Sequence, residues 1–289
     1  MSDAIGFIGL GNIGKPMARR LLAWPHGLLV YDITPAPLAE LEQAGAKIAA
    51  SVRDLAREVR LVCVMVRDDD QVREVLDQIV GAAADGLVVA IHSTVAPRTP
   101  GQLADVAAAH GISLIDAPVS GGAAGAAQGS LAIMVGGSRE AFAVAKDALA
   151  LMGSLVLHAG PVGAGTRMKL ARNLLNFVAM TAATEAQRLA EAAGIDLVAL
   201  GTVVRHTDAI TGGPGAVMHR TTTGQLAPDD FWYDVFSHVR ALGEKDLRFA
   251  VELAAGLGVD VPLARQSLGM LGPGLGLPAE GHASEEMHW

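Results

Sequence analysis

The chain has 289 residues, 51% hydrophobic and 18% charged, which suffices for one large or two ordinary domains and excludes a disordered chain. Its net charge of −8 disfavours a nucleic-acid surface, and no apolar run reaches the roughly 20 residues of a membrane-spanning helix. Apolar alternation from Ala4 leaves no room for a signal or transit peptide, so we expect a soluble, cytoplasmic protein. The single cysteine, Cys63, lies in an apolar run and is expected in the core.

A glycine-rich turn stands near the start of the chain. A strand predicted at residues 4–8 runs into Gly9-Leu10-Gly11-Asn12-Ile13-Gly14, and a helix is predicted at residues 13–23. In such a turn the first glycine permits the tight bend, the second lets the backbone approach a pyrophosphate, and the third lets the helix pack on the strand. The helix N-terminus then faces the phosphates. The pattern predicts a dinucleotide site.

Asp32 follows the next strand, predicted at residues 28–31, about 20 positions past the glycines. An acidic residue there accepts hydrogen bonds from the adenosine ribose and repels a 2′-phosphate, which predicts NAD as the cofactor. The alternative is an aspartate that caps a helix.

Strand and helix patterns alternate through the first half. Strands are predicted at residues 47–49, 61–65, 87–91, 113–116, 130–135 and 154–158, the last at the sheet edge. Helices are predicted at residues 37–44, 52–58, 70–80, 97–109 and 140–152. This alternation predicts a doubly wound, mostly parallel sheet, which binds ligands at the carboxyl ends of its strands.

Segments with polar residues follow three strands of this predicted sheet. Met65-Val66-Arg67 and His92-Ser93-Thr94 stand at two strand ends, and Asp68-Asp69-Asp70 either forms a metal cluster or caps the next helix, as we favour. Asp116-Ala117-Pro118-Val119-Ser120-Gly121-Gly122 follows another strand. Its paired glycines and serine hydroxyl form either a nest for a carboxylate or an ordinary turn.

Strand patterns stop after Gly163, and helices are predicted at residues 166–193, 197–205, 231–257 and 262–271. On the first of these, Lys169, Asn173 and Asn176 share one face of an otherwise apolar helix, which we therefore expect to be buried. A desolvated lysine loses its proton more readily, which suits acid/base chemistry. The alternative is a lysine that reaches solvent or forms an ion pair.

Four motifs thus stand in one order: Gly9–Gly14 with Asp32, Asp116–Gly122, Lys169 with Asn173, and Glu244-Lys245-Asp246-Leu247. This set resembles the β-hydroxyacid dehydrogenase family, which is 6-phosphogluconate dehydrogenase-like and includes 3-hydroxyisobutyrate dehydrogenase and tartronate semialdehyde reductase. The resemblance covers nearly the whole chain. It implies a Rossmann domain at residues 1–162, an all-helical domain for substrate and dimerisation at residues 163–289, and an active site in the cleft between them.

The resemblance also implies roles for particular residues. Lys169 would be the catalytic acid/base, Asn173 would orient the substrate, and Ser120, Gly121 and Gly122 would bind its carboxylate. The residues implied around the cofactor, besides the glycine turn and Asp32, are Val66, Arg67, Thr94 and Lys245. For Lys245 a surface ion pair with Asp246 is the alternative.

Several positions depart from the family pattern. Ile13 replaces a usual methionine, Arg67 a frequent proline, His92 a frequent acidic or small residue, and Arg172 a frequent asparagine. The segment at residues 210–215 lacks the serine and arginine of the isobutyrate enzymes. These departures leave the identity of the substrate undetermined, but they do not change the expected reaction.

We therefore expect reversible hydride transfer between NAD and a small β-hydroxyacid, without a metal, in a homodimer or homotetramer. An imine reductase and a catalytically inactive NAD-binding protein are the rivals, and relatives of both kinds usually lack the lysine. Phe231-Trp232-Tyr233 is expected in the core or a subunit contact rather than against substrate. The tail at residues 281–289 is either mobile or docked on a neighbouring subunit.

Overall fold

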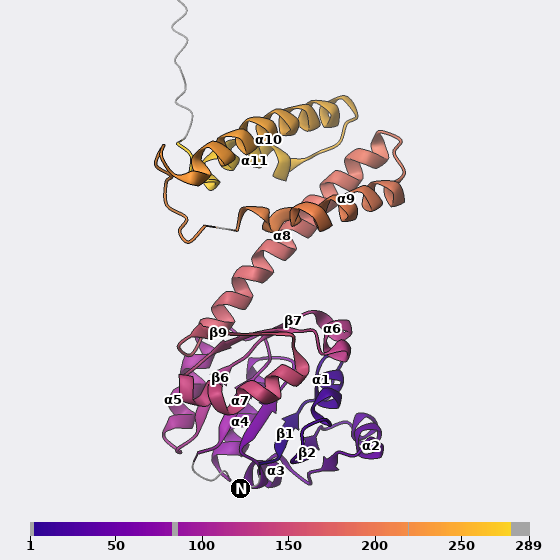
Figure 1. Ribbon diagram of the computed structural model, residues 1–289. Helices are drawn as coiled ribbons and strands as arrows, with labels where there is room; N and C mark the ends of the chain where they lie inside the picture. The colour runs from indigo at the N-terminus through magenta and orange to yellow at the C-terminus, as the bar shows by residue number, and fades with distance from the viewer. Residues whose placement is uncertain (1–2, 83–85, 219, 279–289) are drawn as a thin grey trace, which may run out of the picture. The chain divides into compact units, whose positions relative to one another are not determined.

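The computed structural model describes residues 3–82, 86–218 and 220–278 (Figure 1), so the tail at residues 281–289 lies outside the described residues. Two compact units divide the chain, Met1–Asn173 and Leu174–Trp289. Helix α8 (Ala164–Ala192) begins in the first unit and continues into the second. Lys169 and Asn173 therefore group with the first unit.

The first unit is built on a nine-stranded sheet with the order β3-β2-β1-β4-β5-β6-β8-β7, and β9 pairs with β8 at the edge. Its strands are β1 (Ile5–Ile8), β2 (Leu28–Tyr31), β3 (Lys47–Ile48), β4 (Leu61–Val64), β5 (Val88–Ile91), β6 (Ser113–Asp116), β7 (Val119–Ser120), β8 (Ala132–Gly136) and β9 (Leu155–Gly160). The strands from β3 to β6 are all parallel, whereas β6 and β7 pair antiparallel with β8. This is the Rossmann order, with its switch point beside β1.

Helices cover both faces of this sheet because successive side chains of each strand point to opposite sides. In β4, Leu61 and Cys63 enter one core with α1 and α7, and Val62 and Val64 enter the other with α3, α4 and α5. The helices of this unit are α1 (Gly14–Leu21), α2 (Pro35–Gln43), α3 (Val52–Glu58), α4 (Asp69–Val80), α5 (Thr99–Ala108), α6 (Gly122–Gln128) and α7 (Arg139–Met152). The predicted doubly wound sheet and the buried Cys63 are confirmed.

The aspartate run Asp68–Asp70 lies at the start of α4. Asp68 is the N-cap, and its carboxylate accepts a hydrogen bond from the backbone N–H of Gln71 at 3.0 Å. Asp69 accepts hydrogen bonds from the backbone N–H of Ala96 and the hydroxyl of Thr99. The prediction that this run caps a helix is confirmed.

The described residues of the second unit form helices only, as the pattern after Gly163 predicts. They are the larger part of α8, α9 (Leu197–Thr211), the 3₁₀ turn η1 (Gly213–Val217), α10 (Phe231–Gly256) and α11 (Pro262–Gly274). A small core joins α10 to the segment after α11, and Trp232 and Tyr233 pack against it. The core placement of these two aromatics is confirmed, whereas Phe231 is exposed.

The expectation that the Lys169 helix is buried along its length is wrong for a single chain. Lys169 is buried, but Leu174, Phe177 and Met180 are each more than half exposed. These apolar side chains of α8 are therefore exposed in the single chain. Helix α9 likewise has no buried residue.

Candidate active site

The glycine turn connects β1 to α1 at the carboxyl edge of the sheet. Gly9 has a φ of +93°, and a Cβ there would collide with the carbonyl oxygen of Met65. A Cβ at Gly14 would collide with the carbonyl oxygen of Gly9, whereas a Cβ at Gly11 would meet no atom within 4 Å. Gly9 and Gly14 thus build the turn, and Gly11 keeps its outer side open. That is the arrangement a pyrophosphate needs in order to approach the backbone.

Asp32 lies at the end of β2, directly beside this turn. One carboxylate oxygen accepts a hydrogen bond from the backbone N–H of Leu10, and the other accepts one from Thr34 at 2.7 Å. Each carboxylate oxygen has two lone-pair directions, so Asp32 keeps acceptor capacity for a ribose hydroxyl. Asp32 therefore holds the turn and also offers an acceptor next to it.

The ends of β4 and β5 are linked by a serine for which the sequence suggested no role. The buried Ser93 hydroxyl accepts a hydrogen bond from the N–H of Val66 at 3.0 Å and donates one to its carbonyl at 2.7 Å. This fixes Val66 beside the glycine turn. Arg67 and Thr94 flank the pair and are exposed, and Arg67 forms an ion pair with Asp68 at 2.9 Å.

His92 is buried in the sheet rather than exposed at its edge. Its Nδ1 lies 2.8 Å from the carbonyl oxygen of Ala117, which fits an Nδ1–H donor. Burial lowers the pKa of His92 to about 4, so the ring is neutral at neutral pH. His92 thus links β5 to the loop after β6.

Lys169 lies on the second turn of α8 and points at the loop that contains β7. Its Nζ donates to the carbonyl oxygen of Val119 at 2.6 Å and to Oγ of Ser120 at 2.9 Å. The side chain is buried, and burial lowers the pKa of Lys169, with a further contribution from the positive charge of Arg172. The structure therefore brings together Lys169 and Ser120, which are 49 residues apart.

The two glycines after Ser120 have backbone conformations that side chains disfavour. Gly121 has a φ of +132° and Gly122 a φ of +62°. Gly121 is also the N-cap of α6 and has no side chain with which to cap the helix. The first N–H groups of a helix have no partner within it, so this loop presents donors next to the Ser120 hydroxyl.

Asp116 holds the start of α8 against the sheet, a role the sequence did not suggest. Its buried carboxylate accepts hydrogen bonds from the N–H of Gly163 at 2.7 Å and of Thr166 at 2.6 Å. A Cβ at Gly165 would collide with the carbonyl oxygens of Met134 and Asp116, so the helix approaches the strands closely. This contact fixes the first turn of α8 and, one turn later, Lys169.

The remaining predicted site residues are less tightly placed. Asn173 follows Lys169 by four residues, and its Oδ1 accepts a weak hydrogen bond from Arg172 Nη1 at 3.4 Å. Lys245 lies in α10 of the second unit, where it forms an exposed ion pair with Asp246 at 3.1 Å. The structure shows the ion pair, and the cofactor contact of Lys245 remains a prediction.

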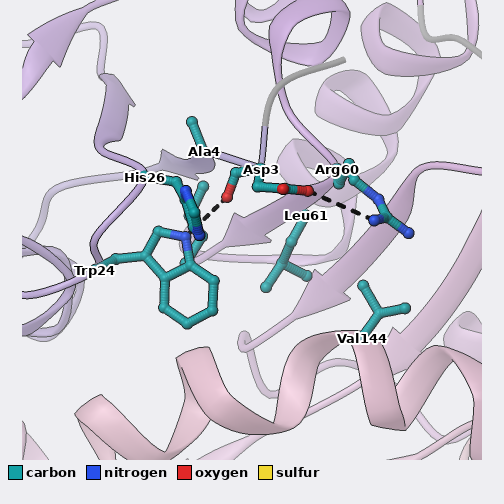
Figure 2. Close-up of a pocket in the computed structure, with 8 residues that line it drawn as sticks. Asp3, Ala4, Trp24, His26, Arg60, Leu61 and Val144 are labelled. Carbon is teal, nitrogen blue, oxygen red and sulfur yellow. Dashed lines mark hydrogen bonds and ion pairs between the residues drawn. The ribbon is translucent and has the colours of Figure 1, made fainter.

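A separate pocket of about 190 Å³ opens at the amino ends of β1 and β4 (Figure 2). Two of its polar side chains already have partners. Arg60 pairs with Asp3 at 3.5 Å, and Trp24 Nε1 donates to the carbonyl oxygen of Asp3 at 2.8 Å. Ligands of doubly wound sheets bind at the opposite, carboxyl edge. The candidate active site is therefore sought at the carboxyl edge, on the side of Lys169.

An open glycine turn at the switch point of a Rossmann sheet, together with a buried lysine beside a hydroxyl and a glycine loop, defines a nicotinamide-dependent oxidoreductase. Residues 4–160 match the NAD binding domain of 6-phosphogluconate dehydrogenase, and residues 163–274 match the NAD-binding region of NADP-dependent 3-hydroxyisobutyrate dehydrogenase. The chain belongs to the β-hydroxyacid dehydrogenase family, as its motifs predict.

Individual relatives agree with this assignment. An uncharacterized oxidoreductase of Mycobacterium tuberculosis is 52% identical over 95% of this chain and 94% of its own. The 3-hydroxyisobutyrate dehydrogenase of Pseudomonas aeruginosa is 35% identical over 91% of this chain and 89% of its own. The crystal structure of an oxidoreductase from Mycobacterium avium 104 aligns with 96% of this chain and 100% of its own chain, at 52% identity and a TM-score of 0.92.

Imine reductases share the fold at much lower identity. The Myxococcus stipitatus imine reductase has a TM-score of 0.75 and 19% identity, over 94% of this chain and 93% of its own. That likeness concerns the fold alone. None of the helices in the described residues is both long and apolar enough to cross a membrane.

Proposed function

We propose that this protein reversibly oxidises a small β-hydroxyacid to its semialdehyde with NAD, using Lys169 as the acid/base. The observation that carries the proposal is the buried Lys169 ammonium, 2.6 Å from the Val119 carbonyl oxygen and 2.9 Å from Ser120 Oγ. A lysine in such a position is desolvated and close to a loop suited to a carboxylate. The proposed dinucleotide-binding Rossmann domain is residues 1–162, and the proposed helical domain for substrate and dimerisation is residues 163–289.

The residues at the carboxyl edge fit a dinucleotide. The backbone from Gly9 to Gly14 would hold the pyrophosphate, and Asp32 would accept from the adenosine ribose. Val66, Arg67 and Thr94 would surround the rest of the cofactor, and Lys245 is a further proposed cofactor contact. When bound, the nicotinamide exchanges a hydride with the carbon that bears the hydroxyl.

Lys169 moves the proton that accompanies this exchange. In the oxidation its neutral amine accepts the hydroxyl proton, and in the reduction its ammonium gives a proton to the carbonyl oxygen. The lowered pKa of Lys169 makes the neutral amine more accessible near neutral pH. Ser120, Gly121 and Gly122 would bind the carboxylate, and Asn173 would orient the hydroxyl, so that reacting atoms meet in one geometry.

Two rivals make different predictions. An imine reductase would reduce cyclic imines and ignore hydroxyacids. An inactive NAD-binding protein would bind NAD but would convert neither cyclic imines nor hydroxyacids. The presence of Lys169 in a buried position beside Ser120 favours the dehydrogenase over both.

The carboxylate requirement tests the function directly. We expect 3-hydroxyisobutyrate-like acids to be oxidised, and the corresponding amide and the alcohol without the acid group to be at least about tenfold poorer in kcat/KM, because only an anion satisfies several donors strongly. NADH absorbance measures all three with the same enzyme sample. Equal activity on the uncharged compounds would contradict the proposal.

Asp32 is expected to make NAD preferred over NADP. Its carboxylate lies beside the glycine turn, where it would face the ribose and oppose the charge of a 2′-phosphate. Asp32→Ala should therefore narrow the ratio of kcat/KM for NAD to that for NADP by about tenfold or more. Asp105→Ala, at an exposed aspartate of α5, is the matched control and should leave the ratio unchanged. Comparable use of both cofactors by the unmodified enzyme would refute the assignment.

We also propose that the chain acts as a cytoplasmic homo-oligomer in which a second copy covers the helical unit. Large apolar side chains of α8 and α9 are exposed in the single chain, and patches of this kind mark interfaces. The residues concerned are Leu174, Phe177, Met180, Val198, Val203 and Ile210. Light scattering on the purified protein gives the number of copies.

A further inference from the structure

Arg172 shares the face of α8 that carries the acid/base and the substrate-orienting amide. It follows Lys169 by three residues, and Asn173 follows by four, so all three side chains lie on one side of the helix. Lys169 is buried against the β7 loop, whereas Arg172 is exposed. The 3.4 Å contact from Arg172 Nη1 to Asn173 Oδ1 places the guanidinium beside that amide.

The charge around Arg172 is not balanced. The first ten residues of α8 contain Arg167, Lys169 and Arg172 but no acidic residue, and the next acid along the helix is Glu185. Within the described residues of the first unit, Arg172 has no carboxylate within ion-pair distance. Asp116, at the start of the helix, already accepts from Gly163 and Thr166. The chain as a whole carries −8, so this local excess of positive charge is distinctive.

Two cations on one helix face repel each other, and the positive charge of Arg172 contributes to the lowered pKa of Lys169. A bound anion relieves that repulsion. The Ser120–Gly122 loop accounts for one carboxylate of a β-hydroxyacid but lies on the Lys169 side of the site. A guanidinium one turn further along, about 4.5 Å in helix rise, suits a second oxyanion because its planar fork binds a carboxylate through two hydrogen bonds.

We propose that Arg172 is a specificity-determining residue that binds a second carboxylate of the substrate, so that the preferred substrates are β-hydroxyacids with two acid groups. The inference rests on the proposed function and names its substrate class. One carboxylate is held at Ser120–Gly122, the hydroxyl faces Lys169, and a second acid a few carbons away reaches Arg172.

A matched pair of substrates tests this. 3-Hydroxyisobutyrate and 2-(hydroxymethyl)succinate share the hydroxymethyl group and the neighbouring acid, and differ in a methyl replaced by a carboxymethyl. The enzyme should prefer the diacid in kcat/KM. Arg172→Gln should reduce that preference by about 10- to 100-fold, the range for losing a charge-assisted hydrogen bond. Both substrates depend on Lys169, so an effect of Arg172→Gln on Lys169 itself cancels in the ratio of the two kcat/KM values.

Two further variants control the result. Arg167→Gln removes an exposed charge from the same helix, five residues away and on another face, and should leave the ratio unchanged. Arg172→Lys should keep part of the preference, since the charge remains without the planar fork. A preference that is absent in the unmodified enzyme, or unchanged in Arg172→Gln, overturns the proposal.

A binding measurement separates this proposal from the proposed function. Calorimetry on the NAD-loaded protein compares 2-methylsuccinate with isobutyrate, neither of which has a hydroxyl to oxidise. Tighter binding of the diacid that is weakened at least about tenfold by Arg172→Gln supports the Arg172 site even if no hydroxyacid is turned over. Equal binding of the two acids overturns it even if 3-hydroxyisobutyrate proves to be a substrate.

Discussion

Lys169→Ala is expected to lower kcat by at least about a hundredfold, the usual scale for losing a positioned proton-transfer group. Lys169 is the buried amine that contacts Ser120 Oγ, and it is the group that we propose accepts the hydroxyl proton. The affinity for NAD should change little, because in the proposed site Gly9–Gly14 and Asp32 would hold the dinucleotide. Steady-state assays measure kcat, and fluorescence titration separately measures the affinity for NAD.

Lys169→Arg should fail nearly as badly, because a guanidinium stays protonated and cannot accept the hydroxyl proton. Lys146→Ala, at an exposed lysine of α7, is the matched control and should retain normal kcat. If Lys169 were structural only, the alanine variant would lose thermal stability while each folded molecule kept its turnover. A folded Lys169→Ala enzyme with near-normal kcat would reopen the choice of function.

The pH dependence of the oxidation should follow the same group. The base must be neutral, so kcat should fall as pH drops through the pKa of Lys169, and that pKa lies below the usual lysine value because the side chain is buried. Arg172→Gln should move this fall to higher pH, since it removes a positive charge that helps lower the pKa.

Much of the first unit follows from local pattern. β2 and β6 match the predicted residues because apolar runs bounded by turn residues define them. The glycine turn was readable because Gly9 and Gly14 each answer a backbone requirement that only glycine meets cheaply, while Gly11 leaves open the side that a pyrophosphate would approach. Such requirements involve residues that are adjacent in the sequence, so they can be predicted from the sequence alone.

What the sequence did not predict depends on contacts between distant residues. β7 has two residues, and α6, with the sequence GAAGAAQ, lacks an apolar period, so both form through packing on β8 and α1. The link from Asp116 to Thr166 spans 50 residues, and nothing local to Asp116 indicates it. The sequence also did not predict that much of α8 is exposed. An apolar helix pattern predicts burial, but it does not tell whether the same chain or another chain buries the helix.

Asp116→Ala is expected to lower the free energy of unfolding by about 2–6 kcal/mol, because the N–H groups of Gly163 and Thr166 each lose their buried acceptor at about 1–3 kcal/mol apiece. Asp116→Asn keeps the shape and one acceptor oxygen but turns an amide N–H₂ toward the other donor, so about 1–3 kcal/mol should be lost. Denaturant unfolding measures both variants, with Asp147→Ala at an exposed aspartate of α7 as the control.

The Asn variant also tests whether this contact places Lys169. Burial raises the pKa of Asp116 despite its two hydrogen bonds, so ionising this carboxyl in place has a free-energy cost. If Asp116 fixes the first turn of α8, the folded Asn variant should lose about tenfold or more in kcat, since small misplacements of catalytic groups are costly, while its affinity for NAD stays normal. A destabilised variant with unchanged kcat would limit Asp116 to stability and leave the placement of Lys169 to the close approach of Gly165 to the strands.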